Sequence, residues 1–104
     1  MASKRTIALD VSPAVRNAVN KRQEIDGYPN CIFGHPSRNL DMAHYIPRSQ
    51  SGLGIEENII GLCRDCHRRL DHTGERQILL RLCKEYLQSK YPDWNEENLK
   101  YRRE

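Results

Sequence analysis

The sequence predicts a small α+β fold made of one domain. The chain has 104 residues, a length that suits a single domain. Short apolar segments at residues 40–46 and 58–62 are typical of paired strands, and helical patterns precede and follow them. Only 38% of the residues in the chain are hydrophobic, and four cysteines offer ligands for a metal ion that would stabilise so small a core. We expect a flexible N-terminus over residues 1–11, a folded domain over 12–90 and a polar C-terminal extension over 91–104.

Composition excludes several classes of protein. The chain has no run of about 18 apolar residues that would cross a membrane, and no secretory leader follows Met1. We therefore expect a cytoplasmic protein, in which thiols are more often metal ligands or core residues than disulfides. The 17 Lys and Arg exceed the 14 Asp and Glu and give a net charge of +3, which is compatible with a polyanionic partner.

The first half of the predicted domain contains a helix and a hairpin. Ser12-Pro13 is a helix-start signal, with a capping residue followed by proline at the first helical position. Gly27 and Pro29 end this helix. The strand at 40–46 is closed by Pro47, and a loop over 49–54 connects it to the strand at 58–62. These two strands form a hairpin with a long loop.

The second half is predicted to be helical. Residues 63–72 form a short basic helix, and a longer helix runs over residues 75–90 until Pro92 stops it. Its apolar residues have the spacing of one buried face, which comprises Leu79, Leu82, Cys83 and Tyr86. Asp93 and Glu96 resemble a capping box for a short last helix that ends at residues 101–103.

The cysteine spacing predicts a structural zinc site. Cys63-Arg-Asp-Cys66 has the spacing with which two thiolates bind one tetrahedral metal, and Cys31 supplies a third. Gly34 stands where a second paired motif would have a cysteine, so His35 is the first candidate for the fourth ligand. Cys83 is the alternative, although its place on an apolar helix stripe favours a buried free cysteine. A redox function for the cysteine pair would need a thioredoxin-like context that the chain lacks.

The histidines near these cysteines form a second pattern. His67 directly follows Cys66, so a zinc ion that fixes Cys66 also fixes the direction of His67. His67 and Asp71 are four residues apart on one helix face and can share a second metal ion, with His72 as a less aligned substitute. A solvated surface pair is the alternative for His67 and Asp71. A further histidine, His44, lies in the first predicted strand.

The run AHYIPRSQSGLGIEENIIGLCRDCHRRLD resembles the HNH nucleases, in particular small members of phage and prophage type. The resemblance covers residues 12–72 and places His44, Asn58 and His67 at the three motif positions. It implies a ββα-metal fold, in which a β-hairpin and a helix grip one catalytic divalent ion. In this chain the motif would be flanked by N- and C-terminal helices and stapled by the structural zinc.

The resemblance also implies roles for these residues. His44 would be the general base that activates water, His67 would bind the ion (Mg²⁺, Mn²⁺ or Ni²⁺), and Asn58 would hold the loop that aims His44. Many members carry a metal ligand directly before the base, where this chain has Ala43. Asp41 is a candidate replacement, so the expected ligands of the catalytic ion are Asp41, His67 and Asp71. Strict alternation puts Asp41 and His44 on opposite faces, so sharing one site would require a bulge or strong twist.

Four arginines flank the predicted active site and suit phosphate contacts: Arg48, Arg64, Arg68 and Arg69. Together with these arginines, the resemblance implies a monomeric, metal-dependent DNA endonuclease that nicks with weak sequence specificity in a bacterial or phage-infected cell. One alternative is a catalytically inactive, zinc-stapled module that binds nucleic acid. Another is an adaptor that works with phage terminase or packaging proteins.

Overall fold

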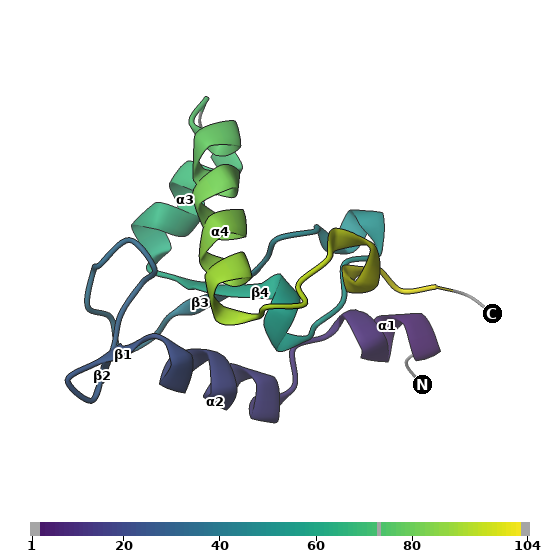
Figure 1. Cartoon of the computed structure of the whole chain (residues 1–104), viewed down its shortest axis with the longest axis horizontal. Helices are drawn as coiled ribbons and strands as arrows, with labels where there is room; N and C mark the ends of the chain where they lie inside the picture. The colour runs from purple at the N-terminus through teal and green to yellow at the C-terminus, as the bar shows by residue number, and fades with distance from the viewer. Residues whose placement is uncertain (1–2, 73, 103–104) are drawn as a thin grey trace.

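A two-stranded antiparallel sheet lies at the centre of the computed structural model, which describes residues 3–72 and 74–102. Strand β3 (Asp41–His44) pairs with β4 (Ile59–Leu62), with Asp41 opposite Leu62 and His44 opposite Ile59. Helix α2 (Pro13–Arg22) lies on one side of this hairpin, and α3 (Arg64–His72) and α4 (Arg76–Lys90) lie on the other (Figure 1). The predicted α+β fold, a hairpin followed directly by a helix, is confirmed.

The hydrophobic core lies between the hairpin, α3 and α4. Ala43 and Leu62 from the sheet are 4% and 0% exposed, and Leu70 of α3 is 4% exposed. Gln23, at the end of α2, links this helix to β4 by two hydrogen bonds. Its side-chain nitrogen donates to the Gly61 carbonyl at 2.8 Å, and its side-chain oxygen accepts from the Gly61 amide at 2.9 Å. Gln23 therefore occupies the edge of β4 as a third strand would, and it leaves no buried polar group of Gly61 unpaired.

The first residues form a docked helix where the sequence led us to expect a flexible segment. Helix α1 (Lys4–Leu9) begins at Ser3, whose hydroxyl accepts a hydrogen bond from the Thr6 amide. Its last residue, Leu9, is only 1% exposed. Because a helix of six residues is too short to be stable alone, the contacts made by its C-terminal end hold it in place.

A second short hairpin lies between α2 and the first zinc-ligand candidate, in a segment for which only a helix end was predicted. Strand β1 (Glu24–Ile25) pairs with β2 (Tyr28–Pro29). The turn residues Asp26 and Gly27 have φ values of 52° and 80°, as in a type I′ turn, for which Asp-Gly is a preferred pair. The signal was therefore present in the sequence at Asp26-Gly27.

The central strands are shorter than predicted because a side chain replaces part of the ladder. Asn58 closes the short 3₁₀ helix η2 (Glu56–Asn58) and is fully buried. Its side-chain oxygen accepts from the Ile46 amide at 2.8 Å, and its nitrogen donates to the Ile46 and Leu53 carbonyls at 3.2 and 2.8 Å. Ile46 therefore leaves the sheet, and the chain turns through Pro47 into the 3₁₀ helix η1 (Arg48–Gln50).

Helix α4 buries a face that differs in part from the predicted one. Leu79 and Cys83 are buried as expected, but Leu82 is 42% exposed and the fully buried residue of the next turn is Leu87. Leu79, Cys83 and Leu87 follow strict i, i+4 spacing, which directs one narrow stripe at the core. The prediction for Leu82 was wrong because an apolar residue at the border of a stripe has no sequence signal for its burial.

The C-terminal segment packs on the loop that follows β3. Its last helix is a 3₁₀ turn, η3 (Glu96–Leu99), capped by Asn95 rather than by the predicted Asp93 box. Leu99 is 2% exposed, its carbonyl accepts from the Leu53 amide, and the Tyr101 amide donates to the Ser51 carbonyl. Among the helices of the described residues, none has the length and apolar character needed to cross a membrane.

Candidate functional site

Three cysteines and one histidine converge where the loop after β2 meets the start of α3. The ligand atoms of Cys31, His35, Cys63 and Cys66 all lie within 4.8 Å of one another. The His35 Nδ1 is 3.3 Å from the Cys66 sulfur and 3.6 Å from the Cys63 sulfur. Ligands of a tetrahedral zinc lie about 3.5 to 3.8 Å apart. The donor types and their spacing therefore fit a Cys₃His zinc site.

The local turn explains why His35 rather than residue 34 completes this set. Gly34 has a φ of 90°, and its amide donates to the Cys31 carbonyl at 2.8 Å. The Cys31 amide in turn donates to the His35 carbonyl at 2.8 Å. Because a residue with a side chain rarely adopts this left-handed conformation, glycine makes the turn and the next residue supplies the ligand.

Cys83 is excluded as the fourth ligand by its position. It lies on α4, is 1% exposed, and does not belong to the four-residue cluster. Burial raises the pKa of its thiol to about 12, so it remains a neutral core residue. Of the two candidates for the fourth ligand, the structure therefore groups His35, and not Cys83, with Cys31, Cys63 and Cys66.

Electrostatics of the cluster favour a bound cation. Burial and the neighbouring sulfurs of Cys63 and Cys31 raise the pKa of Cys66 to about 12, since thiolates packed together repel one another. A dication among the sulfurs reverses this preference because it stabilises every thiolate that it touches. The donor types and their electrostatics therefore fit a metal-binding site, as the geometry does.

One helical turn beyond the cysteines, His67 lies between two carboxylates. Its Nδ1 is 3.0 Å from the Asp41 Oδ2, and its Nε2 is 3.3 Å from the Asp71 Oδ2. Asp41 comes from β3, whereas Asp71 comes from the next turn of α3. The two carboxylates therefore face opposite edges of one imidazole ring.

Asp41 is also bound by an arginine. The Arg64 Nε and Nη2 donate to its two oxygens at 2.8 and 3.3 Å. Burial raises the pKa of Asp41, but the hydrogen bonds from His67 and Arg64 outweigh it and hold the pKa below 3.8. Asp41 is thus an ionised carboxylate whose oxygens are already engaged by two donors.

These residues line an open groove of about 540 Å³, which we call the His67 groove. Two of the four predicted arginines, Arg64 and Arg68, line it, together with Arg16 of α2. Arg69 does not; it pairs with Glu75 at 2.8 Å. The groove is formed by Arg16, Leu40, Asp41, Met42, Arg64, His67, Arg68 and Asp71.

His44 faces away from this groove. Strand β3 pairs in unbroken register, without a bulge, so Asp41 and His44 point to opposite faces as strict alternation requires. The His44 Nε2 lies 2.8 Å from the Leu9 carbonyl oxygen at the end of α1. Burial lowers the pKa of His44 below 6.5, and the charge of Arg48 adds to this effect, while the Leu9 carbonyl and Asp10 oppose it.

Arg48 binds the same Leu9 carbonyl oxygen as His44. Its Nη1 donates to the Leu9 oxygen at 2.9 Å, and its Nη2 pairs with the Asp10 carboxylate at 2.8 Å. Sequence reasoning missed Leu9 and Asp10 as neighbours of His44, because no local pattern marks a backbone carbonyl that lies 35 residues away in the chain.

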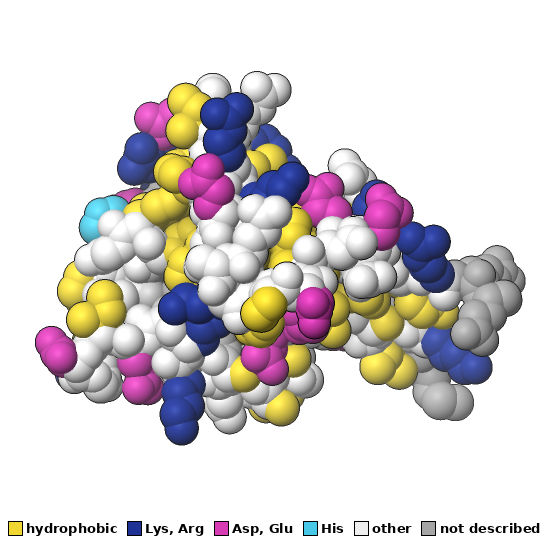
Figure 2. Space-filling view, viewed as in Figure 1, with side chains coloured by type: hydrophobic (Ala, Val, Ile, Leu, Met, Phe, Trp, Pro, Cys, Tyr) yellow, Lys and Arg dark blue, Asp and Glu magenta, His cyan; other side chains and the backbone are white. Residues whose placement is uncertain are grey.

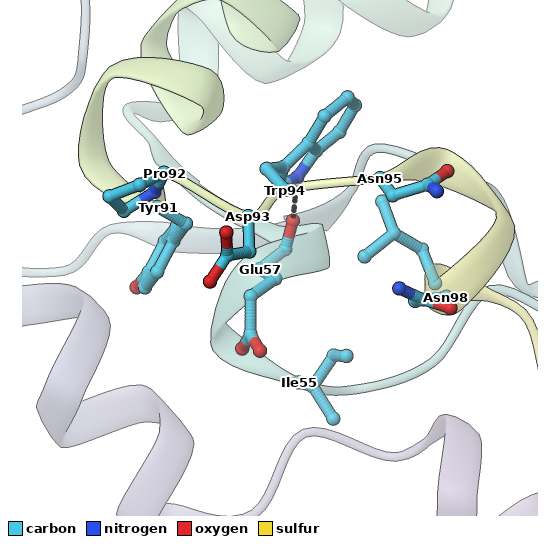
Figure 3. Close-up of a pocket in the computed structure, with 9 residues that line it drawn as sticks. Ile55, Glu57, Tyr91, Pro92, Asp93, Trp94, Asn95 and Asn98 are labelled. Atoms are coloured by element: carbon cyan, nitrogen blue, oxygen red, sulfur yellow. Dashed lines mark hydrogen bonds between the residues drawn. The ribbon is translucent and has the colours of Figure 1, made fainter.

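A separate pocket of about 250 Å³ lies beside the C-terminal segment. Figure 3 shows the carboxylates of Glu57 and Asp93 pointing to the same side of this pocket, beside Tyr91 and Ile55. An acidic opening repels phosphate. Basic and acidic side chains are interspersed over the face drawn in Figure 2, so a phosphate site depends on local arginines, as in the His67 groove.

Comparison with known proteins identifies the central part of the chain. Residues 29–73 match the family described as HNH endonuclease. The matched segment contains the four zinc-ligand candidates, both strands of the central hairpin and α3, and it leaves out α1, α2 and α4. No curated protein matches the chain at a significant level.

Proposed function

We propose, from the match of residues 29–73 to the HNH endonuclease family, that the chain is a divalent-metal-dependent endonuclease that nicks DNA. One observation carries this proposal: His67 lies between two carboxylates in an arginine-lined groove, one residue after a candidate zinc ligand. Carboxylate and imidazole groups suit a catalytic cation, and guanidinium groups suit a phosphodiester.

His67 and Asp71 would hold the catalytic ion. The Nε2 of His67 and the Asp71 carboxylate are 3.3 Å apart on one side of the ring, and both are divalent-metal ligands. When bound there, a divalent cation would supply positive charge for the phosphate and the leaving oxygen. Mg²⁺, Mn²⁺ and Ni²⁺ are the ions to test.

Asp41 would orient His67 rather than bind the ion, which refines the role that the sequence suggested. Its oxygen accepts from Nδ1, on the ring edge opposite Nε2, and Arg64 binds both carboxylate oxygens. A carboxylate on the second nitrogen of a metal-binding histidine fixes the ring and its tautomer.

The role of Asp41 can be separated from that of Asp71 by the amide variants of each. Asp41→Asn keeps an oxygen that accepts from Nδ1, so the ion concentration for half-maximal activity should stay within about threefold of wild type. Asp71→Asn removes a ligand and should raise that concentration by about tenfold or more. Equal shifts in both variants would show that Asp41 is a ligand as well.

The remaining residues would activate water and place the DNA. His44 would act as the general base, because its lowered pKa keeps the imidazole neutral near pH 7, and Asn58 would hold the loop that follows it. Since His44 lies on the face of β3 opposite the His67 groove, this role requires the DNA to pass over the edge of the hairpin so that the scissile phosphate comes within reach of both histidines. Arg64, Arg68 and Arg16 would contact phosphates along the His67 groove. Because phosphate contacts carry no sequence information, specificity should be weak and binding should weaken as salt rises.

The test is the conversion of supercoiled plasmid to open circle by the purified chain with Mg²⁺, Mn²⁺ or Ni²⁺. His44→Ala and His67→Ala should each lower the nicking rate by about 100-fold or more. Arg81→Ala, an exposed arginine of α4 outside the groove, is the matched control and should nick normally. If wild type fails with every ion, the nuclease proposal is refuted.

A catalytically inactive, zinc-stapled nucleic-acid module is the second candidate, favoured by the unbroken register that separates Asp41 from His44. It predicts salt-sensitive plasmid binding without nicking in any ion. A packaging adaptor would show neither nicking nor plasmid binding and would act through protein contacts.

A further inference from the structure

The N-terminal helix contributes a backbone group to the environment of His44. The Leu9 carbonyl oxygen, at the C-terminal end of α1, lies 2.8 Å from the His44 Nε2 and 2.9 Å from the Arg48 Nη1. The second guanidinium nitrogen of Arg48 pairs with Asp10 at 2.8 Å. We call Leu9, Asp10, His44 and Arg48 the Leu9 clasp. Leu9 and Asp10 lie outside residues 29–73, the segment that matches the family.

This contact determines which nitrogen of His44 carries the proton. A carbonyl oxygen can only accept a hydrogen bond, so Nε2 must be the donor. In the neutral ring the lone pair then lies on Nδ1. A general base needs a lone pair in a fixed direction, and the Leu9 carbonyl supplies both the tautomer and the orientation.

The position of this carbonyl is built into the fold. The Gly54 amide donates to the Ala8 carbonyl at 2.9 Å, and Arg5 donates to the Arg48 carbonyl at 3.1 Å. A Cβ atom on Gly54 would lie 2.1 Å from the backbone carbonyl oxygen of Asp10 and 2.9 Å from that of Leu9. Only glycine at position 54 allows the end of α1 to approach this closely.

Arg48 is held within the protein by the same contacts. Its two nitrogens bridge the Leu9 carbonyl and the Asp10 carboxylate, a geometry that requires the planar fork of arginine. In the sequence analysis Arg48 was expected to contact phosphate. In the structure, both terminal nitrogens of Arg48 instead bind Leu9 and Asp10.

We propose that α1 and Asp10 are a positioning element of the active site: through the Leu9 carbonyl and Arg48 they fix the tautomer and direction of His44. This inference rests on the proposed nuclease function for its kinetic consequence. Its structural consequence, the position of the proton on His44, stands independently of catalysis.

The kinetic test uses the full chain with Arg48→Lys, Asp10→Asn and the double variant. Lysine keeps the charge but cannot bridge both partners, so each single variant should lower kcat for nicking about tenfold with KM unchanged. The double variant should be no worse than the singles, because both break the same clasp. Asp26→Asn, an equal charge change at the β1–β2 turn, is the control and should leave kcat unaltered.

A direct contact between Arg48 and phosphate would give a different pattern. In that case Arg48→Lys would retain kcat, Asp10→Asn would retain both parameters, and Arg48→Gln would raise KM. Any of these results would overturn the positioning role of Arg48.

The structural test is long-range ¹H–¹⁵N NMR of the His44 ring, which identifies the protonated nitrogen and needs no DNA. Wild type should show the proton on Nε2 in the neutral ring. Gly54→Ala should give a mixture of tautomers because α1 must shift, and Gly74→Ala, whose added Cβ would meet no atom within 4 Å, should not. If Gly54→Ala does not fold, Asp10→Asn gives the same comparison through a weakened clasp.

The outcomes separate this inference from the nuclease proposal. A wild-type chain with the proton on Nε2 that never nicks would refute the nuclease and retain the clasp. A chain that nicks but carries its proton on Nδ1, or that nicks equally well in all clasp variants, would refute the clasp.

Discussion

Asn58 shows how one buried side chain determines the course of the loop after β3. Its amide makes three hydrogen bonds to backbone groups of Ile46 and Leu53, and the side chain is fully buried. The two hydrogen bonds to Ile46 are buried and the one to Leu53 is partly buried. The loop between β3 and η2 therefore has one conformation as long as residue 58 is asparagine.

Replacing Asn58 should strongly destabilise the folded protein. Asn58→Ala leaves the Ile46 amide and two carbonyls without partners, and we expect a loss of about 3 kcal/mol in the free energy of unfolding. Urea denaturation measures this loss, with exposed Asn39→Ala as the control that should change it by less than about 0.5 kcal/mol. A small effect at Asn58 would mean that water reaches the loop.

The pH dependence of nicking should report the environment of His44. Burial holds the pKa of His44 below 6.5, and Arg48 contributes in the same direction. Since the base acts in its neutral form, kcat/KM should be level near pH 7 and fall only as the pH drops below 6.5. Arg48→Gln removes the nearby positive charge, so its acid limb should move to higher pH. If the acid limb of the Arg48→Gln profile does not move, the limb reports the titration of a group other than His44.

Among the elements, those with local signals were predictable from sequence. Ser12-Pro13 marks the start of α2, and its Ser12 cap is present in the structure. The cysteine pair and His35 were predictable in the same way, because ligand spacing is a local pattern. Helix α1 was not, because its stability comes from contacts near Arg48 and Gly54, far away in the chain.

The hairpin and the candidate catalytic residues were predictable in part. The strands were located, but their ends were not, because Asn58 competes with the ladder at Ile46. The alternation of β3 already indicated that Asp41 and His44 face opposite sides, and the structure shows no bulge that brings them together. The contact between His44 and the Leu9 carbonyl could not be predicted from residue types, since every residue has a backbone carbonyl.

The observed face of α4 gives a prediction at the scale of the element. Leu87 is fully buried and Leu82 is 42% exposed, although both are leucines of one helix. Leu87→Ala should therefore lower the free energy of unfolding by about 3 kcal/mol, and Leu82→Ala by less than about 1 kcal/mol. Thermal and urea unfolding of the pair provide the measurement, and similar losses would show that the other face of α4 is also buried.

For the whole molecule, the candidate zinc site brings together two distant parts of the fold. Cys31 and His35 follow the β1–β2 hairpin, whereas Cys63 and Cys66 begin α3, next to His67. The core that remains is small, with most of its buried apolar residues on the central hairpin, α3 and α4. A metal that binds the folded state alone therefore adds directly to stability.

Removal of zinc should destabilise the entire chain. At free zinc about 1,000 times Kd, binding contributes about 4 kcal/mol, so chelation should lower Tm by about 15 °C or more. Metal analysis should find one zinc per chain in wild type and in Cys83→Ala, and none in Cys66→Ser. One zinc retained in Cys66→Ser, or an unchanged Tm after complete removal, would contradict this assignment.

The packing of residues 99–101 against residues 51–53 has a consequence for the order of synthesis. The backbone groups of Ser51 and Leu53 receive partners from Leu99 and Tyr101, which are synthesised after residues 29–73. Until residues 99–101 have been made, Ser51 and Leu53 lack these two partners. The loop that follows His44 therefore cannot make these two hydrogen bonds until residues 99–101 have folded onto it.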